Sequence, residues 1–249
     1  MDLSIIIPVL NEAKKVENDI AAASKFLLAN NFLGEIIISD DGSEDDTVSV
    51  ARQTKILPGV TVKILESKEH RGKGFAVKQG VFNSAGKFVV FMDSGLCVPL
   101  NYIKDGLNLL ENNECDFAHG SRFLPQSKII RAHLISRQIS SFLFRNIISF
   151  LMSLPPALTD TQCGFKIYKG DVARFLYSKV ITAGFMFDVE IIKRAKQNGY
   201  RILEFPIQWK ADPDSRLSQM RMPKRLFLEL IRIKTALRKE QREKRIKAE

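Results

Sequence analysis

The chain has 249 residues, 45% hydrophobic and 27% charged, which is ordinary globular usage and excludes a disordered, collagen-like or coiled-coil chain. That length suits one α/β domain with an attached segment. Lysine and arginine number 38 against 28 aspartates and glutamates, a net charge of +10, which indicates an anionic partner such as nucleic acid, a membrane surface or a phosphorylated substrate.

The first half of the chain alternates strand and helix patterns. Apolar runs predict strands at 3–9, 35–39, 61–65 and 87–92, and helical spacing predicts helices at 12–28, 45–56 and 73–82. Short apolar strands between helices predict a mostly parallel sheet covered on both faces, in which ligands bind beyond the carboxyl ends of the strands. We therefore expect one crevice to hold the polar residues that follow the first, second and fourth strands, namely Asn11, Glu12, Asp40, Asp41, Asp93 and Ser94.

The second half is less regular. We expect an edge strand at 117–121, a mobile loop at 125–132, a helix with a wide apolar stripe at 137–154, a helix at 189–197 and a strand at 200–208. Residues 221–249 hold 11 basic and 4 acidic residues, a surplus of +7. The sequence thus predicts a single domain at 1–220 and a basic helical tail at 221–249.

The tail has two interpretations, and both are expected to apply. A helix starting at Pro223 would pack its apolar residues on the domain near its start, with its charges forming a solvated face. Beyond Leu237 the charges would act electrostatically. The apolar residues expected to pack are Leu226, Phe227, Leu230, Ile233 and Leu237.

Cysteine usage and hydropathy indicate the compartment. Cys97, Cys115 and Cys163 are odd in number and widely spaced, so we expect reduced thiols in a cytoplasmic protein. Residues 1–8 run directly into a strand pattern, so no signal peptide is expected. No apolar run reaches the ~18 residues of a spanning helix, because Pro155-Pro156 interrupts the nearest one at 138–159. Any membrane contact is expected at the surface.

Two loops carry groups suited to a nucleotide. Asp40 and Asp41 follow a buried strand, where an aspartate can accept a hydrogen bond from a nucleobase, whereas Ser43 and Asp45 fit better as helix caps. Glu12 is either a ligand of this kind or only a first-turn residue. The segment 71–74 (RGKG) places two cations and two glycines at a helix start, which fits either phosphate binding or a basic turn. It does not match the P-loop, which argues against an ordinary ATPase.

Two further segments carry carboxylates. Asp93 closes the most apolar strand and would hold Mg²⁺ or Mn²⁺ against a diphosphate, or only cap a turn. Asp160 lies in the polar segment 160–166 (DTQCGFK) and would act as a general base or orient an attacking oxygen. The alternative for this segment is a turn with Gly164 in a left-handed conformation.

Taken together, these segments resemble the family 2 glycosyltransferases of the GT-A fold over roughly residues 1–220. Within that family the resemblance is to the polyprenyl-phosphate branch, dolichyl-phosphate glucosyltransferases first and dolichol-phosphate mannose synthases next. Six segments in the right order carry it: 5–12, 40–43, 71–74, 120–122, 160–166 and 187–190.

The resemblance implies an inverting transfer of a hexose to a polyprenyl or dolichyl phosphate at the cytoplasmic face of a membrane. It implies UDP-glucose as the preferred donor, GDP-mannose next, and Mg²⁺ or Mn²⁺ on Asp93. The nucleotide sugar would be held by Pro8, Asn11, Glu12, Asp40, Asp41, Lys73, Asp93, Ser94, Lys210 and Arg216. The catalytic groups would be Asp160, Arg122 and Arg137, with Arg137, Ser141 and Arg145 on the acceptor phosphate. Because that acceptor is already an anion, Asp160 would position it rather than deprotonate it.

The sequence departs from this family in two respects. Gly95 stands where the metal motif usually has a second acidic residue, so metal binding would be weaker, completed by water and phosphate, or lost with activity. Many relatives carry transmembrane helices after the catalytic domain, which the stripe at 137–154 and the basic tail would replace as an interfacial anchor on an anionic membrane. The alternatives are a transferase acting on a polysaccharide or protein and a nucleotide-sugar binder with impaired catalysis. A nucleic-acid partner is not expected, because no binding module is present.

Overall fold

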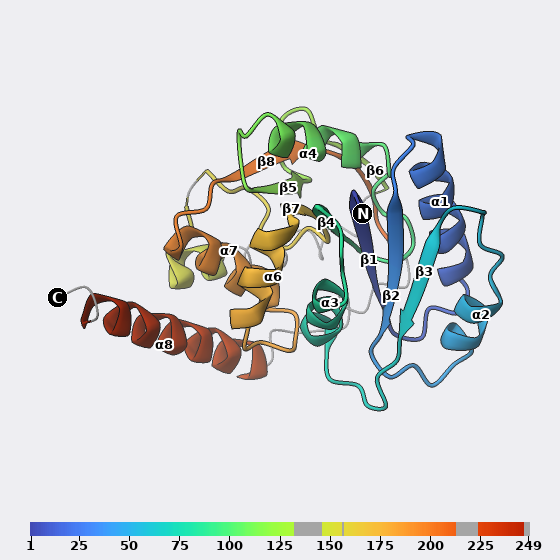
Figure 1. The fold of residues 1–249 in the computed structure, drawn as a ribbon. Helices are drawn as coiled ribbons and strands as arrows, with labels where there is room; N and C mark the ends of the chain where they lie inside the picture. Colours follow the sequence, from blue (N-terminus) through green and yellow to red (C-terminus); the bar gives the residue numbers. More distant parts are fainter. Residues whose placement is uncertain (132–145, 156, 213–223, 247–249) are drawn as a thin grey trace.

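The computed structural model describes residues 1–131, 146–155, 157–212 and 224–246 (Figure 1). The strands are β1 (Leu3–Val9), β2 (Gly34–Asp40), β3 (Thr61–Leu65), β4 (Phe88–Met92), β5 (Phe117–Ser121), β6 (Lys128–Arg131), β7 (Phe165–Lys169), β8 (Ile202–Pro206) and β9 (Gln208–Lys210). The helices are α1 (Val16–Ala29), α2 (Thr47–Gln53), α3 (Lys73–Phe82), α4 (Tyr102–Glu111), α6 (Gly170–Lys179), α7 (Phe187–Gln197) and α8 (Lys224–Ile246). Residues 146–152 are also helical.

A seven-stranded sheet in the order β3-β2-β1-β4-β7-β5-β8 forms the centre of the molecule. Strands β1, β2, β3 and β4 pair with one another in parallel. β7 runs antiparallel to both of its neighbours, β4 and β5, and β8 pairs with β5 in parallel. A second, two-stranded sheet joins β6 to β9. The predicted α/β class with a mostly parallel sheet is confirmed.

The sheet is buried on both faces because its strands carry apolar residues at successive positions. In β1, Ile5 and Ile7 pack into a cluster that holds residues of α1 and α4. Ile6 points to the opposite face and packs into a cluster built from α3, α6, α7 and α8. This alternation follows from the pleat of the strand. It explains why a nearly continuous apolar run forms a central strand rather than an edge strand.

Some boundaries and one loop differ from the sequence predictions. The first helix begins at Val16 rather than at residue 12, because residues 12–15 form a turn in which the Lys15 N–H donates to the Glu12 carbonyl at 2.9 Å. The expected mobile loop at 125–132 is wrong in part, since Lys128–Arg131 is strand β6, paired with β9. Its partner is about 80 residues away in the sequence, so no local pattern could have indicated the pairing.

The C-terminal helix α8 is part of the domain over its first half. Leu226, Leu230, Ile233 and Leu237 are buried in the α6–α7 cluster. The expectation that Phe227 also packs is wrong, because its exposed fraction is 44%. It lies about 100° around the helix from Leu226. Within the described residues, no helix combines the length and the apolar composition needed to cross a bilayer.

Candidate active site

The carboxyl ends of β1, β2 and β4 lie next to one another at one edge of the sheet. β1 pairs with β2 on one side and with β4 on the other, with Val9 opposite Asp40 and Ile6 opposite Phe91. The Asp41 N–H donates to the Val9 carbonyl at 2.9 Å. The strand order therefore brings the polar segments after these three strands to one edge, as the alternating pattern predicted.

The turn after β1 is held by Asn11. Its backbone has a φ of 48°, a left-handed conformation that asparagine tolerates better than most residues. The Asn11 N–H donates to Ser43 Oγ at 2.8 Å, and its side-chain Oδ1 accepts from the Glu44 N–H at 2.7 Å. The Asn11 amide oxygen therefore joins the loops after β1 and β2, and its nucleotide role remains a prediction. Pro8 is half-buried within β1 itself.

The two aspartates after β2 are buried and organise backbone. Asp40 Oδ2 accepts from the N–H groups of Gly42 and Ser43 at 3.0 and 3.1 Å. Asp41 Oδ1 accepts from the N–H groups of Arg71 and Gly72 at 2.9 and 3.0 Å. Asp41 therefore fixes the basic loop that precedes α3. The nucleotide role of both aspartates remains a prediction.

The cap expected at α2 is partly present. No side chain caps the helix from its N-cap position, Asp46. Asp45 Oδ1 accepts from the Thr47 N–H at 3.0 Å, one residue further on. The Glu12 N–H donates to Thr47 Oγ1 at 2.7 Å, so this threonine ties the start of α2 to the turn after β1.

The basic segment at the start of α3 places Lys73 next to the end of β4. Lys73 Nζ lies 2.6 Å from Asp93 Oδ1. Burial disfavours the ammonium, but the carboxylates of Asp93 and Asp188 outweigh it and raise the Lys73 pKa. Arg71 stacks on the Phe75 ring, with its Cζ 3.8 Å from the centroid. The loop thus carries one paired cation and one held against an aromatic ring.

Asp93 fits a site for a hard divalent cation. Among the described residues, no cluster of three or more His, Cys, Asp or Glu side chains is placed to bind a metal ion. Mg²⁺ and Mn²⁺ do not need such a cluster, because substrate phosphates complete their coordination around one or two carboxylates. Asp93 supplies one of them at a strand end facing a cavity.

Ser94 and Gly164 both lie next to Asp93 in the structure. The Ser94 hydroxyl donates to Asp19 Oδ2 at 2.6 Å, and its role in donor binding remains a prediction. Gly164 does not have a positive φ, so the alternative of a left-handed conformation at this residue is wrong. A Cβ at Gly164 would lie 2.0 Å from Asp93 Oδ2, which shows that glycine makes room for the Asp93 carboxylate.

Asp160 is locked in an ion pair with Arg122. Its Oδ2 accepts from Arg122 Nε at 2.6 Å and its Oδ1 from Nη2 at 2.8 Å. Burial alone would raise the Asp160 pKa, but the guanidinium lowers it to about 2. Glu204 holds the backbone there, since its Oε1 accepts from the Asp160 N–H at 2.8 Å. This geometry favours positioning of Arg122 over the general-base alternative.

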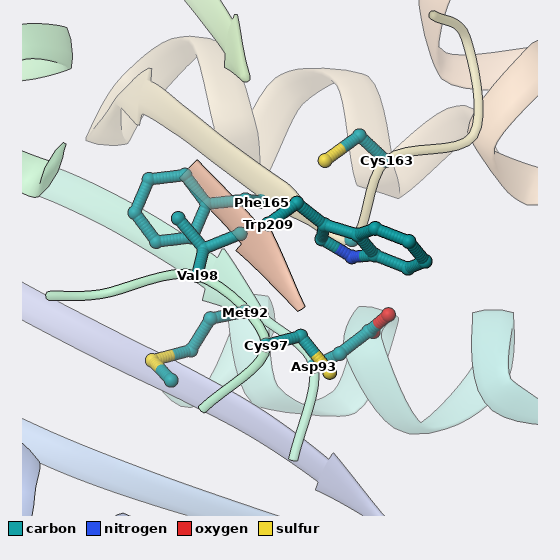
Figure 2. Close-up of a pocket in the computed structure, with 8 residues that line it drawn as sticks. Met92, Asp93, Cys97, Val98, Cys163, Phe165 and Trp209 are labelled. Carbon is teal, nitrogen blue, oxygen red and sulfur yellow. The ribbon is translucent and has the colours of Figure 1, made fainter. Parts of the chain in front are cut away.

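A cavity lies between Asp93 and the segment that carries Asp160. It is a small, partly open pocket lined by Met92, Asp93, Cys97, Val98, Cys163, Gly164, Phe165 and Trp209. In Figure 2 the Trp209 indole lies between Cys163 on one side and Asp93 with Cys97 on the other. The Arg122 guanidinium lies 5.1 Å from the Trp209 ring centroid, so the Asp160–Arg122 pair adjoins this cavity.

The remaining predicted residues divide into two groups. Lys210 is exposed at the end of β9, and its N–H donates to the Cys97 carbonyl at 2.9 Å. The others lie outside the described residues: Arg137, Ser141, Arg145 and Arg216. The structure also brings to the site four residues that sequence reasoning missed, namely Lys15, Asp19, Glu204 and Asp212. Their partners are distant in the sequence, and only Asp19 and Glu204, charged within apolar patterns, carried a local signal.

Comparisons with known proteins agree with this geometry. The glycosyl transferase family 2 model matches residues 4–175. A dolichyl-phosphate beta-glucosyltransferase of Dictyostelium discoideum is 31% identical over 242 residues, covering 93% of this chain and 73% of that protein. The protein of the same name from Homo sapiens is 29% identical, covering 97% and 79%.

Solved structures show the same fold at low identity. Glucosyl-3-phosphoglycerate synthase from Mycobacterium tuberculosis, in complex with Mn²⁺, uridine diphosphate and phosphoglyceric acid, has a TM-score of 0.65 and 18% identity, covering 88% of this chain and 72% of that one. Mannosyl-3-phosphoglycerate synthase from Rubrobacter xylanophilus has a TM-score of 0.66 and 16% identity, covering 97% and 75%. With the family model matched over most of the sheet, this chain belongs to glycosyltransferase family 2 and is an enzyme of the glycosyltransferase class with a GT-A fold.

Proposed function

We propose that this enzyme transfers glucose, with inversion, from a nucleotide sugar to dolichyl or another polyprenyl phosphate, and that UDP-glucose is its preferred donor. The names of the relatives support the sugar and the acceptor. One structural observation carries the proposal. The pocket between Asp93 and Trp209 has the Asp93–Lys73 ion pair on one side and the Asp160–Arg122 ion pair on the other. A donor diphosphate and an acceptor phosphate would meet across it.

The arrangement suits an acceptor that is already an anion. A phosphate oxygen would form a bond to the anomeric carbon as the bond from that carbon to the diphosphate breaks, and the electron pair would leave with the diphosphate. No proton has to be removed, which agrees with an Asp160 carboxylate that Arg122 holds ionised. Arg122 would orient the acceptor phosphate and Lys73 would face the leaving group. A bound Mg²⁺ or Mn²⁺ would supply charge stabilisation on the departing diphosphate.

We also propose that the enzyme binds the cytoplasmic face of an anionic membrane peripherally. An apolar surface is exposed on the helix at 146–152, where the exposed fraction of Phe150 is 84%, and on the first turns of α8. These two helices touch, because Lys234 Nζ donates to the Leu151 carbonyl at 3.0 Å. The exposed apolar residues are Ile147, Phe150, Phe227, Leu228 and Ile231. Apolar side chains followed along α8 by basic ones fit interfacial binding to anionic lipid.

The activity is tested with purified enzyme, polyprenyl phosphate and Mn²⁺, offering UDP-glucose, GDP-mannose and UDP-galactose separately. We expect a glucosylated lipid with UDP-glucose, and loss of it in Arg122→Met. Failure to form any lipid-linked sugar would overturn the proposed acceptor. Transfer of glucose to a polysaccharide or protein instead would support the alternative transferase.

The membrane proposal is tested by flotation with phosphatidylserine-containing vesicles. We expect Phe150→Asp with Leu228→Asp to abolish flotation, and removal of residues 238–249 to weaken it. The truncation begins after Leu237 because the preceding apolar residues of α8 belong to the core. Equal flotation of the wild type and the variants would contradict this surface, and no flotation of the wild type would contradict membrane binding.

A further inference from the structure

Position 95 cannot easily carry the second acidic residue that the metal motif of this family usually has. The backbone of Gly95 has a φ of 90°, a conformation that strains any residue with a Cβ. It is held there by Asp19, whose Oδ1 accepts from the Gly95 N–H at 3.0 Å. The absence of a carboxylate at position 95 therefore follows from the local backbone conformation. Replacing Gly95 with aspartate would strain that backbone.

Another carboxylate faces the space that a side chain at position 95 would enter. A Cβ built on Gly95 would lie 3.8 Å from Asp212 Oδ2 and 3.4 Å from Lys15 Cδ. Asp212 follows β9, and the Lys210 N–H binds the Cys97 carbonyl, so the β9 end is fixed to the segment after β4. Asp212 thus approaches the metal motif from a different strand.

Asp93 and Asp212 both lie near Cys97, close enough for their charges to affect its thiol. Burial raises the pKa of the Cys97 thiol to about 12, and the charges of both carboxylates contribute to the rise. Cys97 lines the cavity together with Asp93. Lys15 Nζ lies 2.8 Å from Asp212 Oδ2 and 2.9 Å from Glu12 Oε2, so an ammonium neutralises Asp212 and holds it in position.

We propose that Asp212 supplies the second carboxylate of the divalent-cation site, in place of an acidic residue at position 95. This rests on the proposed use of a nucleotide-diphosphate donor. Two carboxylates from separate strands, completed by phosphate oxygens, match how Mg²⁺ is usually held. Cation binding would then connect the end of β4 to the segment after β9, the strand that carries Trp209, the only tryptophan of the chain.

The test is a titration with Mn²⁺ followed by electron paramagnetic resonance of the free ion, with and without UDP. We expect Asp212→Asn to weaken Mn²⁺ binding at least 10-fold, since even changes behind a metal ligand cost roughly 10- to 100-fold. Asp105→Asn on α4, an exposed carboxylate outside the site, serves as the matched control and should leave the affinity unchanged. Equal Mn²⁺ affinity in the wild type and Asp212→Asn would overturn the proposal.

The variant Lys15→Met distinguishes two roles for Asp212, binding the cation or only pairing with Lys15. If Asp212 binds the cation, removing the ammonium leaves Mn²⁺ affinity equal or higher, because the carboxylate is no longer neutralised. If Asp212 only anchors Lys15, Lys15→Met lowers the affinity as much as Asp212→Asn does, and the proposal fails. UDP binding is followed separately by Trp209 fluorescence. Failure to bind UDP would contradict the proposed nucleotide donor. The Mn²⁺ titration without nucleotide would still show whether Asp212 binds the cation.

Discussion

Replacing Asp160 with asparagine tests whether this carboxylate holds Arg122 or accepts a proton during the reaction. The change keeps the shape of the side chain but leaves the guanidinium without its anion at 2.6 and 2.8 Å. Breaking a buried ion pair in this way costs about 3–5 kcal/mol. The lowering of the Asp160 pKa from 3.8 to about 2 corresponds to roughly 2 kcal/mol of folding free energy.

The Arg122 side chain keeps an exposed fraction of 20%, so water reaches part of the charge left behind. We therefore expect the free energy of unfolding at pH 7 to fall by roughly 2–3 kcal/mol, towards the lower end of the range for buried pairs. The sign of the pH dependence follows from a pKa that folding lowers. The stabilisation by Asp160 is fully present above pH 4 and is lost as the pH falls from 3.8 towards 2.

The assay is urea unfolding of the wild type, Asp160→Asn and the exposed-site control Asp105→Asn, at pH 7 and pH 3. The gap between the wild type and Asp160→Asn should narrow at pH 3, while the control follows the wild type. An Asp160→Asn protein as stable as the wild type at pH 7 would refute the ion-pair argument. A pH profile of kcat/KM would detect a general base. Such a base would be indicated if the wild-type profile showed a titration near neutral pH that is absent in Asp160→Asn.

Three further predictions concern the surrounding structure. Gly164→Ala would place a Cβ 2.0 Å from Asp93 Oδ2, so we expect at least ~10-fold weaker Mn²⁺ binding in the same titration. Unchanged affinity would contradict the inference that Gly164 makes room for a cation-binding Asp93 carboxylate. Burial raises the Asp19 pKa to about 6, so its charge destabilises the fold by roughly 3 kcal/mol above pH 6. Stability should rise as the pH falls from 6 towards 4, and Asp19→Asn should flatten that rise in urea unfolding. Glu240→Gln removes an exposed partner that lies 2.8 Å from Arg194 Nη1 and should lower the free energy of unfolding by about 1 kcal/mol; a loss above ~3 kcal/mol would mean that α8 docks mainly through this pair.

The central sheet could be predicted because its information is local. Runs such as FVVFM at 88–92 are apolar on both faces, which is typical of strands buried on both sides. Once four such strands alternate with helices, the topology places their carboxyl ends together, and the location of the site follows. Element boundaries were less accurate, since the start of α1 depends on a turn at Glu12 rather than on apolar spacing.

The contacts inside the site could not be predicted, because they join residues that no local pattern connects. Asp160 meets Arg122 across 38 residues, and Lys15 meets Asp212 across 197. The reason for glycine at position 164 could not be predicted from the sequence either. Its local context indicated a turn, whereas the reason for glycine is the Asp93 carboxylate approaching from β4. The sequence pattern could nominate residues for the site but could not assign the partners that these residues have in the structure.

The charges at the site bear on the proposed divalent cation, even though the chain is basic overall. Four carboxylates of the site are paired with three basic side chains, a balance of about −1. The pairs are Asp93 with Lys73, Asp160 with Arg122, and Glu12 and Asp212 with the shared Lys15. A diphosphate and a lipid phosphate would add several negative charges, which the basic side chains of these pairs do not offset because carboxylates already neutralise them. Most of the net charge lies instead in residues 221–249, which carry +7 of the +10. The basic excess of the chain therefore suits attraction to an anionic surface, and in the proposed function a divalent ion between the strand ends would neutralise the donor diphosphate.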